Sequence, residues 1–209
     1  MFGSRLCAII DTALAPGPAP LVAEQLLRAG VRVLQYRGKG PFTGQSWREC
    51  CALAELARSR NARFIVNDRA DVALLCGADG VHLGQEDLPA EQARRLLGEG
   101  KIIGFSTHSV EQAREADRLP VDYLAIGPVF ATTTKQRAEA VVGLETVRAV
   151  RAAVRKPLVA IGGITLENAA AVIEAGADAV AVIRDLLVAP DVEARARQFL
   201  ERLAGCLHH

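Results

Sequence analysis

The chain has 209 residues and a mass of 22.3 kDa, which fits a single domain of ordinary size. Hydrophobic residues make up 50% of the chain and aromatic residues only 4%, so aliphatic side chains must form the core. This composition excludes the disordered, collagen-like and low-complexity classes. The net charge of +1 argues against a nucleic-acid partner, although a local cluster of basic residues can still bind a small phosphate.

Several features favour a cytoplasmic protein without a membrane partner. The apolar run 177–183 is interrupted by Asp178 and is far shorter than the roughly 20 residues of a membrane span. The first residues lack the apolar region of a signal peptide. No C-x-x-C pair occurs, so we expect reduced thiols at the five cysteines, Cys7, Cys50, Cys51, Cys76 and Cys206. We expect residues 207–209 to be disordered or a tag remnant, and a homo-oligomer is left open.

Eight short apolar segments alternate with helical segments along the chain. The apolar segments are typical of strands buried on both faces of a parallel sheet. They are Leu6–Ile10, Val31–Tyr36, Arg63–Val66, Gly80–Leu83, Ile102–Phe105, Tyr123–Ile126, Leu158–Ile161 and Ala179–Ile183. Helical periodicity is clearest at Ser46–Ser59, Glu91–Leu97, Leu144–Val154, Leu166–Ala175 and Val192–Ala204.

Glycine and capping residues mark the connections between these segments. Glycine after a helix adopts positive φ without steric penalty, which predicts helix-to-strand turns at Gly30, Gly77 and Gly176. Side chains that cap helix N-termini are expected at Ser109, Thr165 and Asp191.

The repeated strand–helix order predicts an α/β fold, a (β/α)8 TIM barrel forming one compact domain over residues 1–209. Eight units in this length average about 26 residues each, at the short end for such barrels. A doubly wound open sheet is the alternative, but no G-x-G-x-x-G follows any predicted strand.

Charged side chains follow the predicted strands, at the end of a barrel where active sites lie. Arg37 and Lys39 follow the second strand and Lys135 follows the sixth, so cations from two loops could clamp a phosphate or diphosphate. Asp68 and Asp87 follow the third and fourth strands. Two carboxylates together with substrate phosphates are a usual arrangement for binding Mg²⁺.

A second anion site is predicted near the later strands. The Thr132–Thr134 hydroxyls and the Gly162-Gly163 backbone precede a helix expected to start near Thr165, whose N-terminus would attract a phosphate. Two anion sites and a metal site indicate two phosphorylated substrates, of which one carries a diphosphate.

Each signal has a structural alternative when taken alone. Arg37 and Lys39 could belong to a solvated loop, and Asp68 could form a surface ion pair with Arg69. The Gly162-Gly163 pair could only permit close packing, and His82 could be a core histidine. Their concentration on consecutive strand ends favours a functional site.

Six segments of the chain resemble the thiamine phosphate synthase family, and the match extends from Leu6 to Leu203. They are residues 35–39 (QYRGK), 67–71 (NDRAD), 80–87 (GVHLGQED), 104–108 (GFSTH), 122–135 (DYLAIGPVFATTTK) and 160–164 (AIGGI). The resemblance implies a transferase of thiamine biosynthesis that joins hydroxymethylpyrimidine diphosphate to thiazole phosphate, giving thiamine phosphate and pyrophosphate. It implies that diphosphate leaves first and that the thiazole nitrogen captures the pyrimidine cation.

The resemblance also assigns roles to residues. It implies catalytic roles for Arg37, Lys39, Ser106 and Lys135, and Mg²⁺ as the cofactor on Asp68 and Asp87. Substrate contacts are implied for Gln35, Arg37, Lys39, Asn67, His82, Ser106, Thr132, Thr134, Lys135, Gly163 and Ile183. Among these, Gln35 and His82 would lie near the pyrimidine, and Thr132, Thr134 and Gly163 would hold the thiazole phosphate.

The chain departs from the family pattern in three places. Arg184 stands in the last phosphate loop, where it could contact phosphate or pair with Asp185. Segment 136–142 lacks the Lys-Asp continuation that is common in the family after Lys135, so a role of this loop as a lid is left open. At the end of the first strand, Asp11-Thr12 matches the family pattern only loosely. The related thiazole tautomerase and a non-catalytic phosphate-binding barrel are the alternative functions. The complete set of diphosphate-handling residues favours the synthase.

Overall fold

The structure of the chain is a computed structural model that describes residues 4–132 and 140–206. The predictions for Thr134, Lys135 and residues 207–209 therefore lie outside the described residues.

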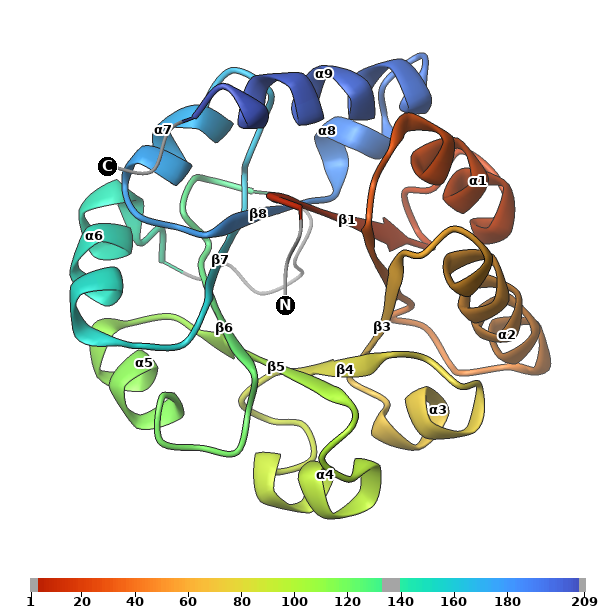
Figure 1. The fold of residues 1–209 in the computed structure, drawn as a ribbon, viewed down its shortest axis with the longest axis horizontal. Coiled ribbons are helices and arrows are strands. Elements are labelled where there is room, and N and C mark those ends of the chain that lie inside the picture. The colour runs from red at the N-terminus through yellow and green to blue at the C-terminus, as the bar shows by residue number, and fades with distance from the viewer. Residues whose placement is uncertain (1–3, 133–139, 207–209) are drawn as a thin grey trace.

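Parallel strands form a closed barrel, and helices surround it on the outside (Figure 1). Each strand pairs with its neighbours in chain order, and the first strand closes the barrel against the last. The strands are β1 (Leu6–Asp11), β2 (Val33–Arg37), β3 (Arg63–Asn67), β4 (Gly80–Leu83), β5 (Ile102–Thr107), β6 (Tyr123–Ile126), β7 (Leu158–Ile161) and β8 (Ala179–Val182). The helices of the described residues are α1 (Ala19–Ala29), α2 (Gly44–Ser59), α3 (Ala70–Leu75), α4 (Ala90–Leu97), α5 (Val110–Ala116), α6 (Gly143–Ala153), α7 (Ala169–Glu174), α8 (Arg184–Leu187) and α9 (Val192–Ala204). The predicted (β/α)8 barrel is confirmed.

Several strands run further toward the barrel mouth than their apolar residues predict. β1 extends to Asp11, β3 to Asn67 and β5 to Thr107, while β2 begins at Val33 and ends at Arg37. Polar residues at strand ends still pair along the backbone, because the neighbouring strand supplies the hydrogen bonds whatever the side chain is. Asp11 and Arg37, which are gained in this way, lie at the mouth, whereas Thr107 is fully buried and donates to the carbonyl oxygen of Ala125.

The hydrophobic residues divide between the inside and the outside of the barrel. Inward-facing residues form a small cluster of Cys7, Ile9, Val33, Tyr123, Val159, Ala179 and Ala181. The larger cluster lies between the strands and the helices, and includes Leu34, Phe64, Leu124 and Phe199, all fully buried. Alternate residues of each strand therefore point to opposite sides, as period-two geometry requires.

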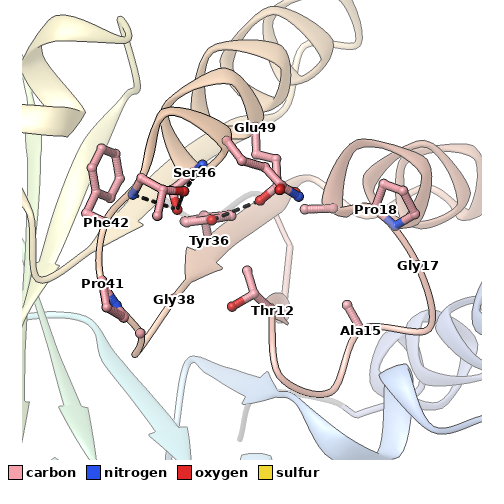
Figure 2. Close-up of a pocket in the computed structure, with 14 residues that line it drawn as sticks. Thr12, Ala15, Gly17, Pro18, Tyr36, Gly38, Pro41, Phe42, Ser46 and Glu49 are labelled. Atoms are coloured by element: carbon pink, nitrogen blue, oxygen red, sulfur yellow. Dashed lines mark hydrogen bonds between the residues drawn. The ribbon is translucent and has the colours of Figure 1, made fainter.

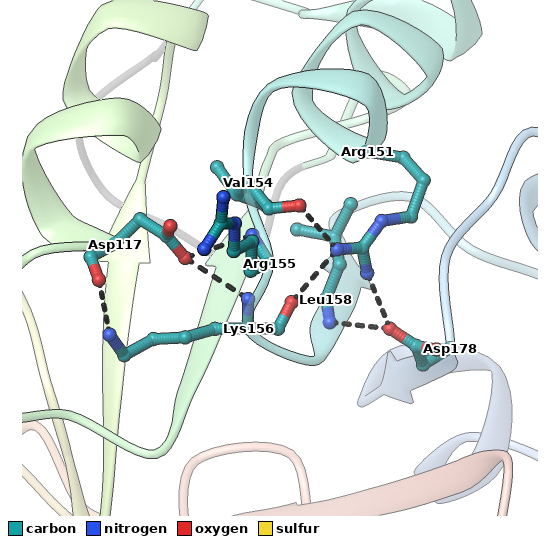
Figure 3. A network of polar contacts seen from close by, with 7 residues as sticks. All are labelled: Asp117, Arg151, Val154, Arg155, Lys156, Leu158 and Asp178. Atoms are coloured by element: carbon teal, nitrogen blue, oxygen red, sulfur yellow. Dashed lines mark hydrogen bonds and ion pairs between the residues drawn. The ribbon is translucent and has the colours of Figure 1, made fainter.

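At the end of the barrel opposite the mouth, an aspartate just before one strand accepts a hydrogen bond from the backbone of the preceding strand. Asp178 accepts a hydrogen bond from the backbone N–H of Leu158 at 2.7 Å and pairs with Arg151 at 2.9 Å (Figure 3). The same arrangement recurs twice, with Asp79 on Phe64 and Arg63 and with Asp122 on Ile103 and Arg94. This end of the barrel is thereby stabilised by charge-assisted hydrogen bonds.

Two predicted helix caps are confirmed and one is wrong. Ser109 and Asp191 each accept a hydrogen bond from the backbone N–H three residues later, at 3.2 and 2.9 Å. Thr165 does not cap α7, because this helix begins only at Ala169. Instead the Asn168 side chain accepts a hydrogen bond from the N–H of Thr165 at 2.8 Å and stabilises a turn before the helix.

None of the helices within residues 4–132 and 140–206 is both long and apolar enough to cross a membrane.

Candidate active site

Strand β2 presents alternate side chains to the barrel interior and the mouth. Gln35 and Arg37 face inward, as predicted from alternation, and Arg37 is paired in register with Asp11 of β1. Asp11 is only 2% exposed and forms an ion pair with Arg37. Its other carboxylate oxygen accepts the N–H of Ala13 at 2.9 Å. The guanidinium of Arg37 is thus held at the first strands of the mouth.

A cation and two carboxylates meet at the ends of β2, β3 and β4. Nζ of Lys39 lies 2.5 Å from a carboxylate oxygen of Asp68, and Asp87 accepts the N–H of Gly84 at 2.7 Å. Burial raises the pKa of Asp87, and the neighbouring Asp68 carboxylate raises it further, while Gly84 and Lys39 oppose the rise. The two predicted metal ligands therefore lie close enough to interact. The suggested Asp68–Arg69 pair is not formed, since Arg69 pairs with Asp71.

The backbone at Asp68 is unusual for a residue other than glycine. Its φ of 65° is in the left-handed region, which Asp tolerates better than most residues. The N–H of Asp68 donates to the carbonyl oxygen of His82 at 2.8 Å and fixes this turn on β4. The conformation turns the chain directly after β3, where the carboxylate meets Lys39.

The carboxylate pair fits a metal that takes part of its coordination from substrate. Among the described residues, no group of three or more His, Cys, Asp or Glu could hold a metal ion. The described residues around Asp68 and Asp87 thus supply only part of a metal coordination shell. Mg²⁺ commonly binds one or two carboxylates and completes its octahedral shell with water and phosphate oxygens.

His82 and Ser106 lie together on the inner face, between β4, β5 and β6. Nε2 of His82 lies 2.9 Å from Oγ of Ser106, and Nδ1 lies 2.8 Å from the hydroxyl of Tyr123. Gln85 donates to the carbonyl oxygen of Ser106 at 2.5 Å. Asn67 is the register partner of His82 and so faces the same interior. His82 is therefore buried, as the core alternative predicts, and it also contacts Ser106 at the mouth.

The loops after β6 and β7 approach each other through glycine. Gly162 and Gly163 have φ values of 98° and 62°. A Cβ atom on Gly162 would lie 2.5 Å from Pro128, and one on Gly163 would lie 2.5 Å from the carbonyl oxygen of Ala131. The prediction that these glycines directly precede a helix N-terminus is wrong, because α7 starts at Ala169. The backbone N–H groups of this glycine pair are still of the type that binds anions.

The residues after β8 show whether Arg184 pairs with Asp185. Ile183 follows the strand as the N-cap residue of α8 and packs partly buried against the barrel. Asp185 pairs with Arg195 at 3.6 Å and accepts the N–H of Leu166, so it does not pair with Arg184. Arg184 is an exposed residue immediately after the rim position Ile183.

A pocket of about 380 Å³ lies outside the barrel, between the loops after β1 and β2 (Figure 2). The hydroxyl of Tyr36 donates to Glu49 of α2 at 2.9 Å across one wall. Among the described residues that line the pocket, Glu49 carries the only charge. This pocket is therefore unsuited to a phosphate, in contrast to the mouth, where Arg37 and Lys39 lie.

Sequence reasoning missed two residues of the mouth, Asp11 and Tyr123. Asp11 follows the first predicted strand but matches the family pattern only loosely, and Tyr123 lies within a predicted apolar strand. Strand alternation was the available signal, because it places both on the same face as the cluster of Cys7 and Ile9.

Comparisons with known proteins identify the family of the chain. A family model described as thiamine monophosphate synthase matches residues 6–186. The thiamine-phosphate synthase of Chloroflexus aurantiacus is 47% identical over 195 residues, covering 93% of this chain and 90% of the relative. That of Koribacter versatilis is 50% identical over 208 residues, covering 95% of each chain.

Solved structures give the same result. The thiamine phosphate pyrophosphorylase from Pyrococcus furiosus has a TM-score of 0.89 at 37% identity, covering 98% of this chain and 97% of that chain. The 3-hexulose-6-phosphate synthase from Salmonella typhimurium, with a TM-score of 0.76 at 16% identity over 97% of this chain and all of that one, shares the barrel fold alone. The chain belongs to the thiamine monophosphate synthase family.

Proposed function

We propose that this chain condenses 4-amino-2-methyl-5-hydroxymethylpyrimidine diphosphate with thiazole phosphate, giving thiamine phosphate and pyrophosphate. The observation that carries the proposal is the meeting of Lys39, Asp68 and Asp87 at one side of the barrel mouth, in a chain of this family. A diphosphate leaving group requires neutralisation of several negative charges, and these residues bring together a cation and two carboxylates of the kind that bind Mg²⁺.

Mg²⁺ held by Asp68 and Asp87 would neutralise charge on the departing diphosphate. Arg37 and Lys39 would supply the protein's own cations for the diphosphate, and Lys135 would be the third by family resemblance. In the structure Lys39 pairs with Asp68. A diphosphate that arrives with the metal would replace Asp68 as the partner of the ammonium group, so Lys39 would contribute charge without leaving the mouth.

The inner face of the barrel would bind the organic parts of the substrates. Gln35 and His82 would contact the pyrimidine, Asn67 would contact the diphosphate, and Ser106 would lie near the reacting centre or the diphosphate. Thr132, Thr134 and Gly163 would hold the thiazole phosphate, and Ile183 would be a further substrate contact. No basic side chain is needed to activate the nucleophile, because the thiazole nitrogen attacks through a lone pair and loses no proton. The five free thiols fit a cytoplasmic enzyme of this kind.

The test is to incubate the purified protein with both substrates, with and without Mg²⁺, and to follow thiamine phosphate and pyrophosphate by chromatography. We expect both products in equal amounts, and only with the metal. Absence of product with Mg²⁺ would contradict the proposal. Isomerisation of the thiazole alone would identify a tautomerase, and binding of the phosphates without any conversion would identify a non-catalytic barrel.

A further inference from the structure

Tyr123 lies inside the barrel, beneath the mouth. The residue is 4% exposed and packs in the inner cluster with Cys7, Ile9 and Val159. Its ring occupies space that exists because residue 104 is glycine, since a Cβ atom there would lie 2.0 Å from the ring. A phenol in apolar surroundings is unfavourable unless its hydroxyl is hydrogen-bonded, and phenylalanine would fill the same space without this requirement.

The hydroxyl of Tyr123 begins a chain of hydrogen bonds that leads to the mouth. It lies 2.8 Å from Nδ1 of His82, whose Nε2 lies 2.9 Å from Oγ of Ser106. The rings of Tyr123 and His82 lie 5.5 Å apart between centroids. Ser106 is the member of the chain that is nearest to the mouth and only partly buried.

We propose that Tyr123 is a positioning residue that acts on Ser106 through His82. The Tyr123 hydroxyl donates to Nδ1 of His82, Nε2–H donates to Oγ of Ser106, and Ser106 presents its own proton to the mouth. The proposal rests on the proposed function in one respect, which is that the ligand next to Ser106 is an anionic diphosphate.

The direction of the chain follows from the chemistry of its members. Burial raises the pKa of Tyr123 well above its usual range, so the phenol keeps its proton and can donate it. A neutral imidazole that accepts at Nδ1 carries its proton on Nε2. An oxygen that accepts from Nε2–H is left with its own proton to donate. The reverse direction would make Ser106 donate into the barrel and expose a lone pair to the anion, which is unfavourable.

The chain moves no proton during the reaction. It fixes one tautomer of His82 and one orientation of the Ser106 hydroxyl, so the donor is in place before substrate binds. Gln85 holds the backbone of the same residue through the carbonyl oxygen of Ser106 at 2.5 Å. Both the backbone and the hydroxyl of Ser106 are therefore restrained.

The experiment compares Tyr123→Phe with Tyr36→Phe, which changes the chain's other tyrosine. Tyr36 is also 4% exposed and hydrogen-bonded, to Glu49 at 2.9 Å, but it faces the helices. Steady-state kinetics are measured for both substrates, and ¹⁵N NMR of histidine-labelled protein reports the tautomer of His82, assigned with His82→Gln. For Tyr123→Phe we expect kcat to fall about 10-fold, the KM for thiazole phosphate to stay unchanged, and the Nε2–H tautomer to lose its preference. Tyr36→Phe should change neither kcat nor the tautomer.

A double-mutant cycle separates positioning from a general loss of stability. In the Ser106→Ala background, Tyr123→Phe should have no further effect on kcat, because its influence passes through the missing hydroxyl. Equal effects in both backgrounds, or an Nδ1–H tautomer in the wild-type protein, would overturn the proposal. The wild-type tautomer is measurable without turnover. A protein that forms no thiamine phosphate but shows Nε2–H would thus contradict the proposed function alone.

Discussion

At the scale of single residues, the carboxylates of Asp68 and Asp87 lie close enough to repel each other. Their mutual repulsion is partly offset by Lys39, at 2.5 Å from Asp68, and by the N–H of Gly84, at 2.7 Å from Asp87. The raised pKa of Asp87 reflects burial and the unfavourable proximity of Asp68. A site of this kind is destabilising until a cation binds, which is common where function requires a strained arrangement.

We therefore expect Asp87→Asn to stabilise the metal-free protein slightly while it abolishes Mg²⁺-dependent turnover. The amide oxygen can still accept the N–H of Gly84, and one negative charge next to Asp68 is removed. The free energy of unfolding at pH 7 should rise by up to about 1 kcal/mol, as measured by urea denaturation. Product formation should fall by at least about 100-fold. Unchanged turnover would mean that Asp87 is not a metal ligand, and Glu86→Gln serves as the neighbouring control.

Much of this site could be predicted from the sequence, for reasons that differ between residues. Arg37 and Asp68 follow apolar strands, and parallel strands bring their ends together at one rim. Asp11 also follows its predicted strand, but its role depends on the ion pair with Arg37, its register partner on β2. Tyr123 could not be assigned in this way, because it lies within a strand and its role depends on the hydrogen bond to His82.

At the scale of elements, aspartates at the starts of strands are the recurring contacts that hold neighbouring units together. Asp178 binds the N–H of Leu158 and the guanidinium of Arg151, which also donates to the carbonyl oxygen of Val154 at 2.7 Å (Figure 3). One side chain thus links the end of α6, the start of β7 and the start of β8. These contacts lie at the end of the barrel opposite the mouth.

We expect Asp178→Ala to lower the free energy of unfolding by about 1–3 kcal/mol, because it leaves the N–H of Leu158 and the Arg151 guanidinium without this acceptor. The kcat of the folded enzyme should be unchanged, since the substitution lies far from the mouth. Urea denaturation and kinetics at saturating substrate measure the two quantities. Glu145→Ala is the matched control, because its ion pair with Arg148 is exposed and should contribute less than about 0.5 kcal/mol. An equal loss in the free energy of unfolding in both variants would show that the Asp178 contacts stabilise the protein no more than a surface ion pair does.

The elements themselves were predictable where strand and helix periodicity was strong, and less so at their ends. The last helix, Val192–Ala204, has the bounds that its periodicity and the Asp191 cap predict. The seventh helix begins three residues later than predicted, because Asn168 bonds back to Thr165 and forms a separate turn. A local side-chain contact of this kind competes with a helix start and leaves no trace in hydrophobic periodicity.

At the scale of the whole molecule, metal and diphosphate should bind as a unit, because the described residues provide only an incomplete metal shell. We expect pyrophosphate with Mg²⁺ to raise the melting temperature by about 5–10 °C at 100 times the dissociation constant. Mg²⁺ alone should raise it by less than about 2 °C, since Lys39 already pairs with Asp68. Differential scanning calorimetry measures both shifts. A full shift with Mg²⁺ alone would indicate a complete metal site within the protein.

The pairing of β1 with β8 determines when the barrel can close. Leu6 is the register partner of Val180, so β1 gains one of its two neighbours only after the chain has been synthesised past β8. Until then β1 exposes an unpaired backbone edge, which in other proteins favours association with a second chain. Closure therefore depends on a contact between distant parts of the chain, and such contacts slow folding. Ending the chain before Ala179, the first residue of β8, would leave β1 and β7 each with one unpaired edge.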